Sequence, residues 1–244
     1  MQGMRDLDWG AFTEHGPWTL DTGSIAWLAE APELRRRARA EVPVLTTPRR
    51  LPPGSRVLTV GALLTRALGP WLLRKRRGGY SDTATSRADV SLRLRKAAEA
   101  LGPTYIKLGQ IISSGEGLFP AELVDEFKRC RDQVRAESWE TVRRVVEEDL
   151  GRTIESVFSS FERTPLAAAS IAQVHRATLR TGEEVVVKVQ RPQVSALVHK
   201  DLEVLAYLAP HLVGRIPIAA LANPPALVEL FADTIVEELD FRLE

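Results

Sequence analysis

Two runs of β-forming residues joined by a turn constrain the fold of this chain most. The first run spans residues 173–179, and the second spans residues 184–190 and contains four valines. Between them, Thr181 and Gly182 supply the residue types that tight turns favour. The pattern predicts an antiparallel hairpin whose second strand carries one lysine, Lys188, among the valines.

Lys188 is the first candidate functional residue. Valines on both sides of it predict a strand mostly hidden from water, where an unpaired ammonium group is costly to bury. Lys188 then needs an anion, either a carboxylate on a neighbouring helix or a phosphate of a ligand lying over the sheet. The alternative is an edge-strand lysine that faces solvent, because strands commonly carry one outward charge.

The composition narrows the possible functions. The 244 residues are 44% hydrophobic and carry 33 basic and 32 acidic side chains, so no global field favours a nucleic-acid partner. The single cysteine, Cys130, rules out an internal disulfide and any cysteine-based metal cluster, and no metal site is expected. The acidic N-terminus and the absence of a run of about 18 apolar residues argue against secretion and membrane spanning.

The N-terminal third divides into two segments. Residues 1–50 show no sustained period and are expected to form a disordered tail, followed by a proline-spaced linker. Residues 51–79 contain six basic residues and no acidic one, and end on the basic run 74–77. This basic amphipathic segment suits an anionic membrane surface. The alternative is a helix packed on the domain body with a solvated basic end. Its apolar stripe consists of Val57, Val60, Leu64, Ala67 and Trp71.

The next segment is helical. A charged helix is expected to end at Gly102, and Pro103 suits the first turn of a new helix. In that second helix Lys107 and Gln110 lie three residues apart and share a face. Gly109 between them costs about 1 kcal/mol relative to alanine in a helix, which indicates close helix packing or a ligand approach. Further helices are expected from Pro120, from the cap Ser138 to Gly151, and briefly near residues 153–160.

The last helix is expected to end in carboxylates. Its inward stripe is predicted to comprise Leu227, Leu230, Phe231, Thr234, Ile235, Glu238 and Phe241. Asp240 and Glu244 are four residues apart and share a face, whereas Glu238 points elsewhere. Because a helix C-terminus disfavours negative charge, a cationic partner such as Lys188 is expected nearby, the alternative being a solvated acidic end.

Four short motifs in this order resemble the ABC1/UbiB (AarF) family of atypical kinases over residues 86–244. They are Lys107-Leu108-Gly109-Gln110 (K-x-G-Q), the alanine-rich Ala167 to Ser170 leading into QVH, VVVKVQRP around Lys188, and Glu238-Leu239-Asp240. The resemblance implies an α+β fold: a protein-kinase-like small lobe, with an antiparallel sheet and an αC-type helix, preceded by a helical K-x-G-Q extension. Accordingly, residues 86–160 are assigned to the extension and residues 161–244 to the lobe, truncated at its αC-type helix.

The resemblance also implies roles for individual residues. Lys188 would contact nucleotide phosphates and pair with Glu244, and the alanine-rich turn would take the place of a glycine-rich loop over the phosphates. That turn consists of Ala167, Ala168, Ala169 and Ser170. The K-x-G-Q helix would fold over the site as a lid, with Lys107, Gly109 and Gln110 near Glu238 and Asp240.

The implied ligand is ATP with Mg²⁺, and the implied activity is that of an ATPase or a small-molecule or lipid kinase tied to isoprenoid quinones. The implied location is cytoplasmic, peripheral at the inner face of the membrane. Two departures stand out: Gly115 and Gly117 replace an Arg and an Asp found in many members, and no catalytic-loop or DFG-type segment is present. The large lobe is thus expected to be missing and the chain to be catalytically incompetent. The alternative is a non-catalytic membrane-associated binding or regulatory module.

Overall fold

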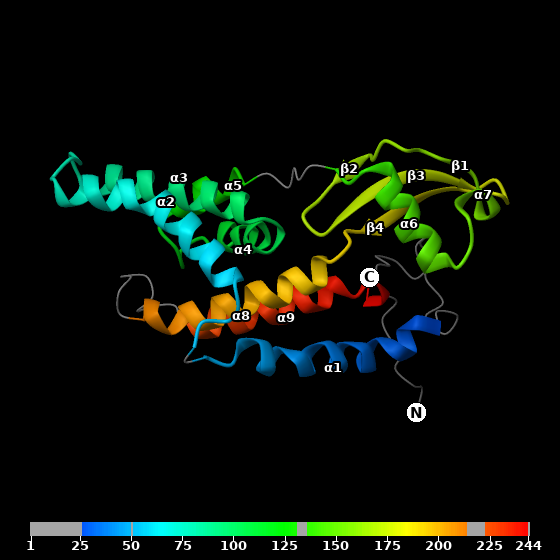
Figure 1. Ribbon diagram of the computed structural model, residues 1–244, viewed down its shortest axis with the longest axis horizontal. Helices are drawn as coiled ribbons and strands as arrows, with labels where there is room; N and C mark the ends of the chain where they lie inside the picture. The colour runs from blue at the N-terminus through cyan, green and yellow to red at the C-terminus, as the bar shows by residue number, and fades with distance from the viewer. Residues whose placement is uncertain (1–25, 50, 131–135, 214–222, 244) are drawn as a thin grey trace, which may run out of the picture.

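The computed structural model describes residues 26–49, 51–130, 136–213 and 223–243. In Figure 1, helices α2 to α5 form one group, the sheet with α6 and α7 forms a second, and the long helices α1, α8 and α9 run along both. The elements are α1 (Ala26–Thr46), α2 (Arg56–Arg76), α3 (Thr83–Leu101), α4 (Pro103–Ser113), α5 (Ala121–Lys128), α6 (Trp139–Leu150), α7 (Ile154–Val157), β1 (Phe158–Phe161), β2 (Ala167–Ala168), β3 (Ala172–Leu179), β4 (Glu184–Gln190), α8 (Val194–Leu212), α9 (Pro224–Leu239) and the 3₁₀ helix η3 (Phe241–Leu243). This arrangement of helices around one small antiparallel sheet agrees with the coarse architecture predicted from the sequence.

Strand β3 is the centre of the antiparallel sheet. It pairs with β4 along one edge, and with β1 and β2 along successive parts of the other. Gly182, in the β3–β4 turn, has φ +101°, a conformation that favours glycine. The predicted hairpin is confirmed, and its strand bounds differ from the prediction by one residue.

Only one face of β4 is buried. Val185, Val187 and Val189 pack in the cluster that α6 covers, whereas Val186 and Lys188 project from the opposite face and are exposed. The prediction that this strand is mostly hidden from water is therefore wrong. Among the described residues β4 lies at the sheet edge, and alternating side chains require only one buried face there.

The buried side chains form three clusters, one for each group of elements. Cluster one joins α1, α8 and α9 to the start of β3 and includes Val42, Leu45, Ala172, Val198, Leu202, Phe231, Ile235 and Val236. Cluster two joins α2 to α5 with α8 and includes Val60, Leu101, Tyr105, Ile106, Phe127 and Val204. Cluster three lies between α6, α7 and the sheet and includes Val142, Val146, Ile154, Phe158, Ala177 and Val189. Because α8 contributes to two of these clusters, it connects the helical group to the rest of the molecule.

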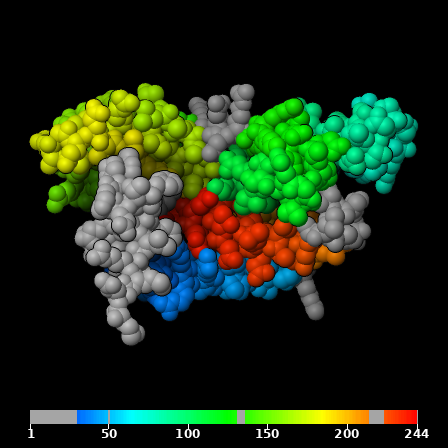
Figure 2. Space-filling model, turned by 180° about the vertical axis from the view of Figure 1, so that it is seen from behind, coloured from blue at the N-terminus to red at the C-terminus, as the bar shows by residue number. Residues whose placement is uncertain are grey.

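Helix α1 corrects the expectation of a disordered tail for residues 26–46. Its buried side chains are Ala31, Leu34, Val42 and Leu45, and the helix packs along α9 and α8. Figure 2 shows α1 in blue beside the orange-to-red surface of α9. Pro43 lies inside the helix, near its end, although its spacing with later prolines predicted a linker. The part of the predicted tail before residue 26 lies outside the described residues.

Helix α2 packs its predicted apolar stripe on the molecule. Val60 is fully buried, and Val57 and Leu64 are partly buried against the same cluster. The alternative of a helix packed on the domain body therefore holds for this stripe. The α2–α3 hairpin nevertheless projects well beyond the other elements (Figures 1 and 2).

Several element ends follow the local signals in the sequence. Gly102 separates α3 from α4, whose first residue is Pro103. The Ser138 hydroxyl accepts the Thr141 backbone N–H at the start of α6, and Gly151 ends that helix with φ +61°. The predicted helical turn at 153–160 is shorter, since β1 starts at Phe158. Helices α6 and α7 pack on the sheet, so the sheet unit begins before the predicted boundary at residue 161.

Candidate functional site

The K-x-G-Q helix α4 meets the end of α9 through an ion pair. Lys107 Nζ lies 2.5 Å from Glu238 Oε1, and both side chains are partly exposed. The structure thus brings together the two motif residues that the resemblance expected to be neighbours. The Gln110 side chain, one turn further on, makes no hydrogen bond within the described part of the chain. The lid role itself stays a prediction.

Gly109 is the point of closest packing between α4 and α5. A Cβ atom at this position would lie 2.4 Å from Cδ1 of Phe127, well inside van der Waals contact. Of the two explanations open at the sequence level, helix–helix packing accounts for this glycine. Gly115 has the same relation to Phe119, whose ring would meet a Cβ at 2.7 Å.

Asp240, one member of the predicted carboxylate pair, does not lie on the α9 helix. The helix ends at Leu239, and Asp240 is in an extended conformation with φ −101° and ψ 93°. Arg242 binds the Asp240 carboxylate through Nε at 2.8 Å and Nη2 at 2.6 Å. These bonds, opposed in part by burial, lower the pKa of Asp240. Glu244, the predicted partner of Lys188, lies outside the described residues.

Lys188 lies beside the segment that follows α9. Its Nζ is 4.3 Å from the centroid of the Phe241 ring, a cation–π geometry. The neighbouring Gln190 side chain donates from Nε2 to the Leu239 carbonyl at 2.8 Å. Two contacts therefore hold the end of α9 and η3 against β4. Phe241 was predicted to face inward on a helix, but nothing in the sequence pointed to its contact with Lys188.

The alanine-rich turn is part of the same sheet. Ala167 pairs with Val174, which in turn pairs with Lys188, so the three residues form one row across β2, β3 and β4. Two strand spacings of about 4.8 Å place the Ala167 and Lys188 backbones roughly 10 Å apart. The Ala169 N–H donates to the Ala172 carbonyl at 2.8 Å, and Ser170 is buried. The four predicted residues thus comprise a short strand and a tight turn into β3.

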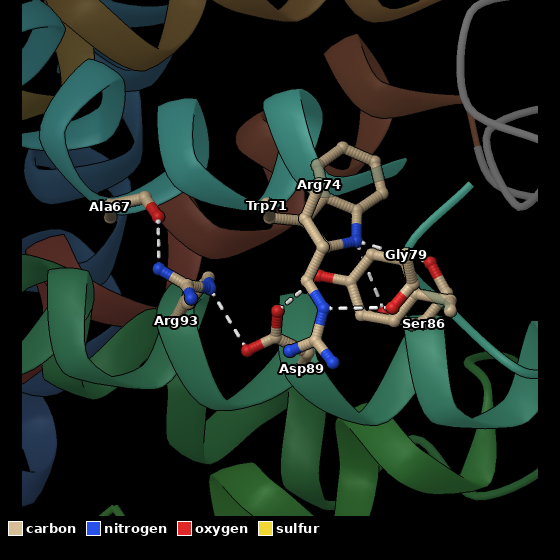
Figure 3. Close-up of polar contacts among 8 residues, drawn as sticks. Ala67, Trp71, Arg74, Gly79, Ser86, Asp89 and Arg93 are labelled. Carbon is tan, nitrogen blue, oxygen red and sulfur yellow. Dashed lines mark hydrogen bonds and ion pairs between the residues drawn. The ribbon is translucent and has the colours of Figure 1, made fainter. Parts of the chain in front are cut away.

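A second polar cluster fixes the projecting α2–α3 hairpin (Figure 3). The Trp71 indole N–H points to Ser86 and lies 3.2 Å from both its carbonyl oxygen and its hydroxyl. Further along, Arg93 donates to the Ala67 carbonyl at 3.2 Å and to the Asp89 carboxylate at 2.9 Å. Trp71 therefore joins α2 to α3 instead of standing free on the surface.

The described ranges contain no group of three or more His, Cys, Asp or Glu side chains placed to hold a metal ion. None of their helices is both long and apolar enough to cross a bilayer.

Fold and site together define a class of protein. The sheet is covered by helices on one face and exposes a lysine on the other, where the end of a later helix lies beside that lysine; this is consistent with a kinase-like small lobe. Residues 129–244 match the family model described as the ABC1 atypical kinase-like domain. This match and the relatives below support membership of the ABC1/UbiB family.

Some of the similar curated proteins are named UbiB, and others are uncharacterised. A "probable protein kinase UbiB" of Aeromonas hydrophila is 38% identical over 185 residues, which cover 75% of this chain and 32% of the relative. Another, from Pseudomonas fluorescens, is 43% identical over 152 residues, or 62% of this chain and 28% of the relative. An uncharacterised protein of Mycobacterium tuberculosis is 46% identical over 144 residues, 59% of this chain and 29% of the relative. The chain spans about a third of the length of these relatives or less.

Proposed function

We propose that this chain is the nucleotide-handling small lobe of an atypical kinase or ATPase, and that Lys188 contacts the phosphates of ATP. The observation that carries the proposal is the position of Lys188: an exposed lysine on the open face of the sheet, in one row with the alanine-rich turn. A lysine ammonium is a point charge suited to phosphate oxygens. The turn from Ala167 to Ser170 would cover those phosphates from β2.

We expect Mg²⁺ to bind as a complex with the nucleotide. The described residues offer no cluster of ligands for a metal, and two carboxylates at the end of α9, Glu238 and Asp240, are engaged by Lys107 and Arg242. The ion supplies charge neutralisation for the phosphates when it is bound. The contribution of this chain is Lys188 and the shape of the turn.

The α4 helix is the proposed lid of this site. The ion pair from Lys107 to Glu238 joins it to the end of α9, and Gly109 allows α5 to pack closely against its other side. The exposed fractions of the Lys107 and Glu238 side chains, 23% and 32%, show a pair that solvent reaches. Exposed pairs typically contribute about 0–1 kcal/mol, so this contact can open at low cost.

Substitution of Lys188 tests the nucleotide proposal. Lys188→Ala removes the phosphate-facing charge, and we expect the Kd for ATP to rise at least about tenfold, since charged hydrogen bonds contribute about 1.5–3 kcal/mol. Lys200→Ala is the matched control, because Lys200 is an exposed lysine on α8, outside the site. Isothermal titration calorimetry of both variants gives the comparison. Equal affinities for the two variants contradict the assignment.

Turnover is a separate expectation. The 244 residues contain no catalytic-loop or DFG-type segment, so we expect no Mg-ATP hydrolysis by this chain alone. A steady-state phosphate-release assay measures it. Hydrolysis that disappears in Lys188→Ala would show that these residues suffice for catalysis.

The second candidate function is a membrane-associated binding module, with an isoprenoid lipid or quinone pathway as its setting and the inner membrane face as its location. One observation favours it: the outward side of α2 exposes Leu58, Leu72 and Leu73 by 73%, 43% and 50%. At the end of the same helix, Arg76 and Arg77 are exposed and make no ion pair within the described ranges. Apolar side chains beside unpaired cations suit an anionic lipid surface.

Vesicle co-sedimentation tests this second function. We expect binding to phosphatidylglycerol vesicles that falls with salt and is lost in Arg76→Gln/Arg77→Gln. The control, Arg36→Gln/Arg37→Gln, removes two exposed arginines from α1, which pair with Glu33. Equal binding by both double variants, or binding to neutral vesicles alone, would exclude a lipid-facing basic end on α2.

A further inference from the structure

The segment that carries the alanine-rich turn is held at both ends by buried side chains. At its start, the Glu162 carbonyl lies 2.8 Å from Nδ1 of His175. At its end, the Ala169 carbonyl accepts a hydrogen bond from Nε of Arg191 at 3.0 Å. Residues 162–169 are thus held at both ends by side chains from elsewhere in the chain: His175 lies on β3, and Arg191 directly follows β4.

The two anchors belong to one continuous network. Arg191 Nη1 donates to the Glu137 carboxylate at 2.7 Å, and the Glu137 backbone N–H donates to Gln173 Oε1 at 2.8 Å. Gln173 Nε2 lies 2.8 Å from Nε2 of His175. Since the Glu162 carbonyl can only accept, His175 carries its proton on Nδ1, and its Nε2 accepts from the Gln173 amide.

The network is buried behind the sheet. Gln173 and His175 are almost completely inaccessible, and the Arg191 side chain is only 7% exposed. Strand alternation places Gln173 and His175 opposite Val189 and Val187, on the face away from Lys188. The rings of Trp139 and Phe161 pack around His175 there. These side chains therefore act on the turn without standing where a nucleotide would lie.

Burial makes the links through Gln173, His175 and Arg191 costly to lose, whereas the Glu137 side chain is 35% exposed. An unpaired polar group in this environment is destabilised far more than one in water, and a satisfied network specifies one geometry. Two directed bonds, to the Ala169 carbonyl and to the Glu137 carboxylate, orient the Arg191 guanidinium. Its Nη2 is buried and has no acceptor within the described ranges, so only those two bonds are satisfied. Loss of Arg191 would release the end of the turn.

We infer that Arg191, with Glu137, Gln173 and His175, forms a set of positioning residues that presets the alanine-rich turn for the nucleotide phosphates. The inference rests on the proposed function for the role of the turn, and on the observed bonds for its rigidity. A loop fixed before binding loses less conformational entropy when the ligand arrives. Alanines, with less backbone freedom than glycines, act in the same direction.

Hydrogen–deuterium exchange of the full chain without nucleotide tests the rigidity. In Arg191→Ala, we expect peptides covering residues 162–172 to exchange at least about tenfold faster, with those of α8 and α9 unchanged. Arg180→Ala is the matched control, since Arg180 also donates from Nε to a carbonyl, that of Glu155, at 3.0 Å. It should leave residues 162–172 unaffected. No local change in Arg191→Ala, or a uniform rise across the sheet, overturns the inference.

Milder variants cover the case in which Arg191→Ala does not fold. Arg191→Lys keeps a positive charge for Glu137 but cannot bond to Glu137 and to the Ala169 carbonyl in the same geometry. Glu137→Gln keeps a hydrogen-bond acceptor for Arg191 but removes the negative charge. Both are expected to give smaller increases of exchange in the same peptides. Wild-type exchange rates in both folded variants overturn the inference.

Nucleotide titrations separate this inference from the proposed function. Arg191→Ala is expected to weaken ATP and ADP binding about tenfold but to leave adenosine binding unchanged, because the turn would contact phosphates only. If the wild-type chain binds no nucleotide, the proposed function fails, while the exchange result still decides whether the network presets the turn. Equal weakening of ATP and adenosine overturns the positioning role.

Discussion

At the scale of single residues, Gly109 determines how closely the K-x-G-Q helix approaches α5. Gly109→Ala would place a methyl group 2.4 Å from the Phe127 ring, and we expect a loss of about 1–3 kcal/mol in the free energy of unfolding. Gly61→Ala is the control, since Gly61 lies inside α2 with open space around it; it is expected to stabilise by about 0.5–1 kcal/mol. Urea denaturation measures both. Stabilisation by both substitutions would contradict the close packing.

Asp240 offers a second prediction at this scale. Arg242 lowers the pKa of the Asp240 carboxyl in the folded chain. Its contribution to stability is therefore present above the ordinary aspartate pKa and is lost as the pH falls through the lower, folded-state pKa. Carbon NMR titration should show Asp240 titrating below its usual range, and a return toward that range in Arg242→Ala. An unchanged titration in the variant would mean that another group causes the shift.

At the scale of elements, an ion pair between a buried carboxylate and a partly buried arginine connects the extension to α8. Arg56 of α2 donates to Asp201 from Nε at 2.7 Å, and the Thr104 hydroxyl of α4 donates to the same carboxylate at 2.7 Å. Asp201 is completely buried. Burial and the nearby Asp201 charge raise the pKa of Tyr105, whose hydroxyl lies in the same interior. Three helices thus meet at one carboxylate.

Substitution of Asp201 should separate these helices. Asp201→Ala leaves the Arg56 guanidinium without its buried partner, and we expect a cost of about 3–5 kcal/mol. Arg39→Ala is the contrast, because its 2.7 Å bond to Glu237 lies at the surface and is expected to contribute about 0–1 kcal/mol. Thermal denaturation of both variants, and of Arg56→Met/Asp201→Leu, measures the difference. Recovery of stability in the double variant identifies the unpaired charge as the cause; no recovery would point to lost packing.

At the scale of the whole molecule, α1 covers the back of the helices that carry the site. It packs along α9 and η3, and α9 contributes Phe231 and Ile235 to the shared core. Removal of residues 1–48 would expose this apolar surface. Compared with a chain that lacks only residues 1–25 and keeps α1, we expect a lower melting temperature and increased binding of an apolar dye. Equal melting temperatures would show that α1 is dispensable for the fold.

Local signals in the sequence were sufficient for much of the fold. The β3–β4 hairpin follows from β-forming runs around Thr181-Gly182, and the α3–α4 junction follows from Gly102-Pro103. Such signals act through the backbone preferences of a few consecutive residues. The proximity of Lys107 to Glu238 came instead from the family resemblance, because these residues are far apart in the chain.

The sequence by itself determined the hairpin, the α3–α4 junction, the start and end of α6, and the resemblance to the ABC1/UbiB family. Tertiary structure alone decided that α1 is a packed helix, that Lys188 is exposed at a sheet edge, and that α9 stops before Asp240. It also decided the contacts of Phe241 with Lys188 and of Arg191 with the alanine-rich turn. The burial of a side chain and its contact partners depend on which distant segments of the chain pack against it. The residues next to it in the sequence do not determine this.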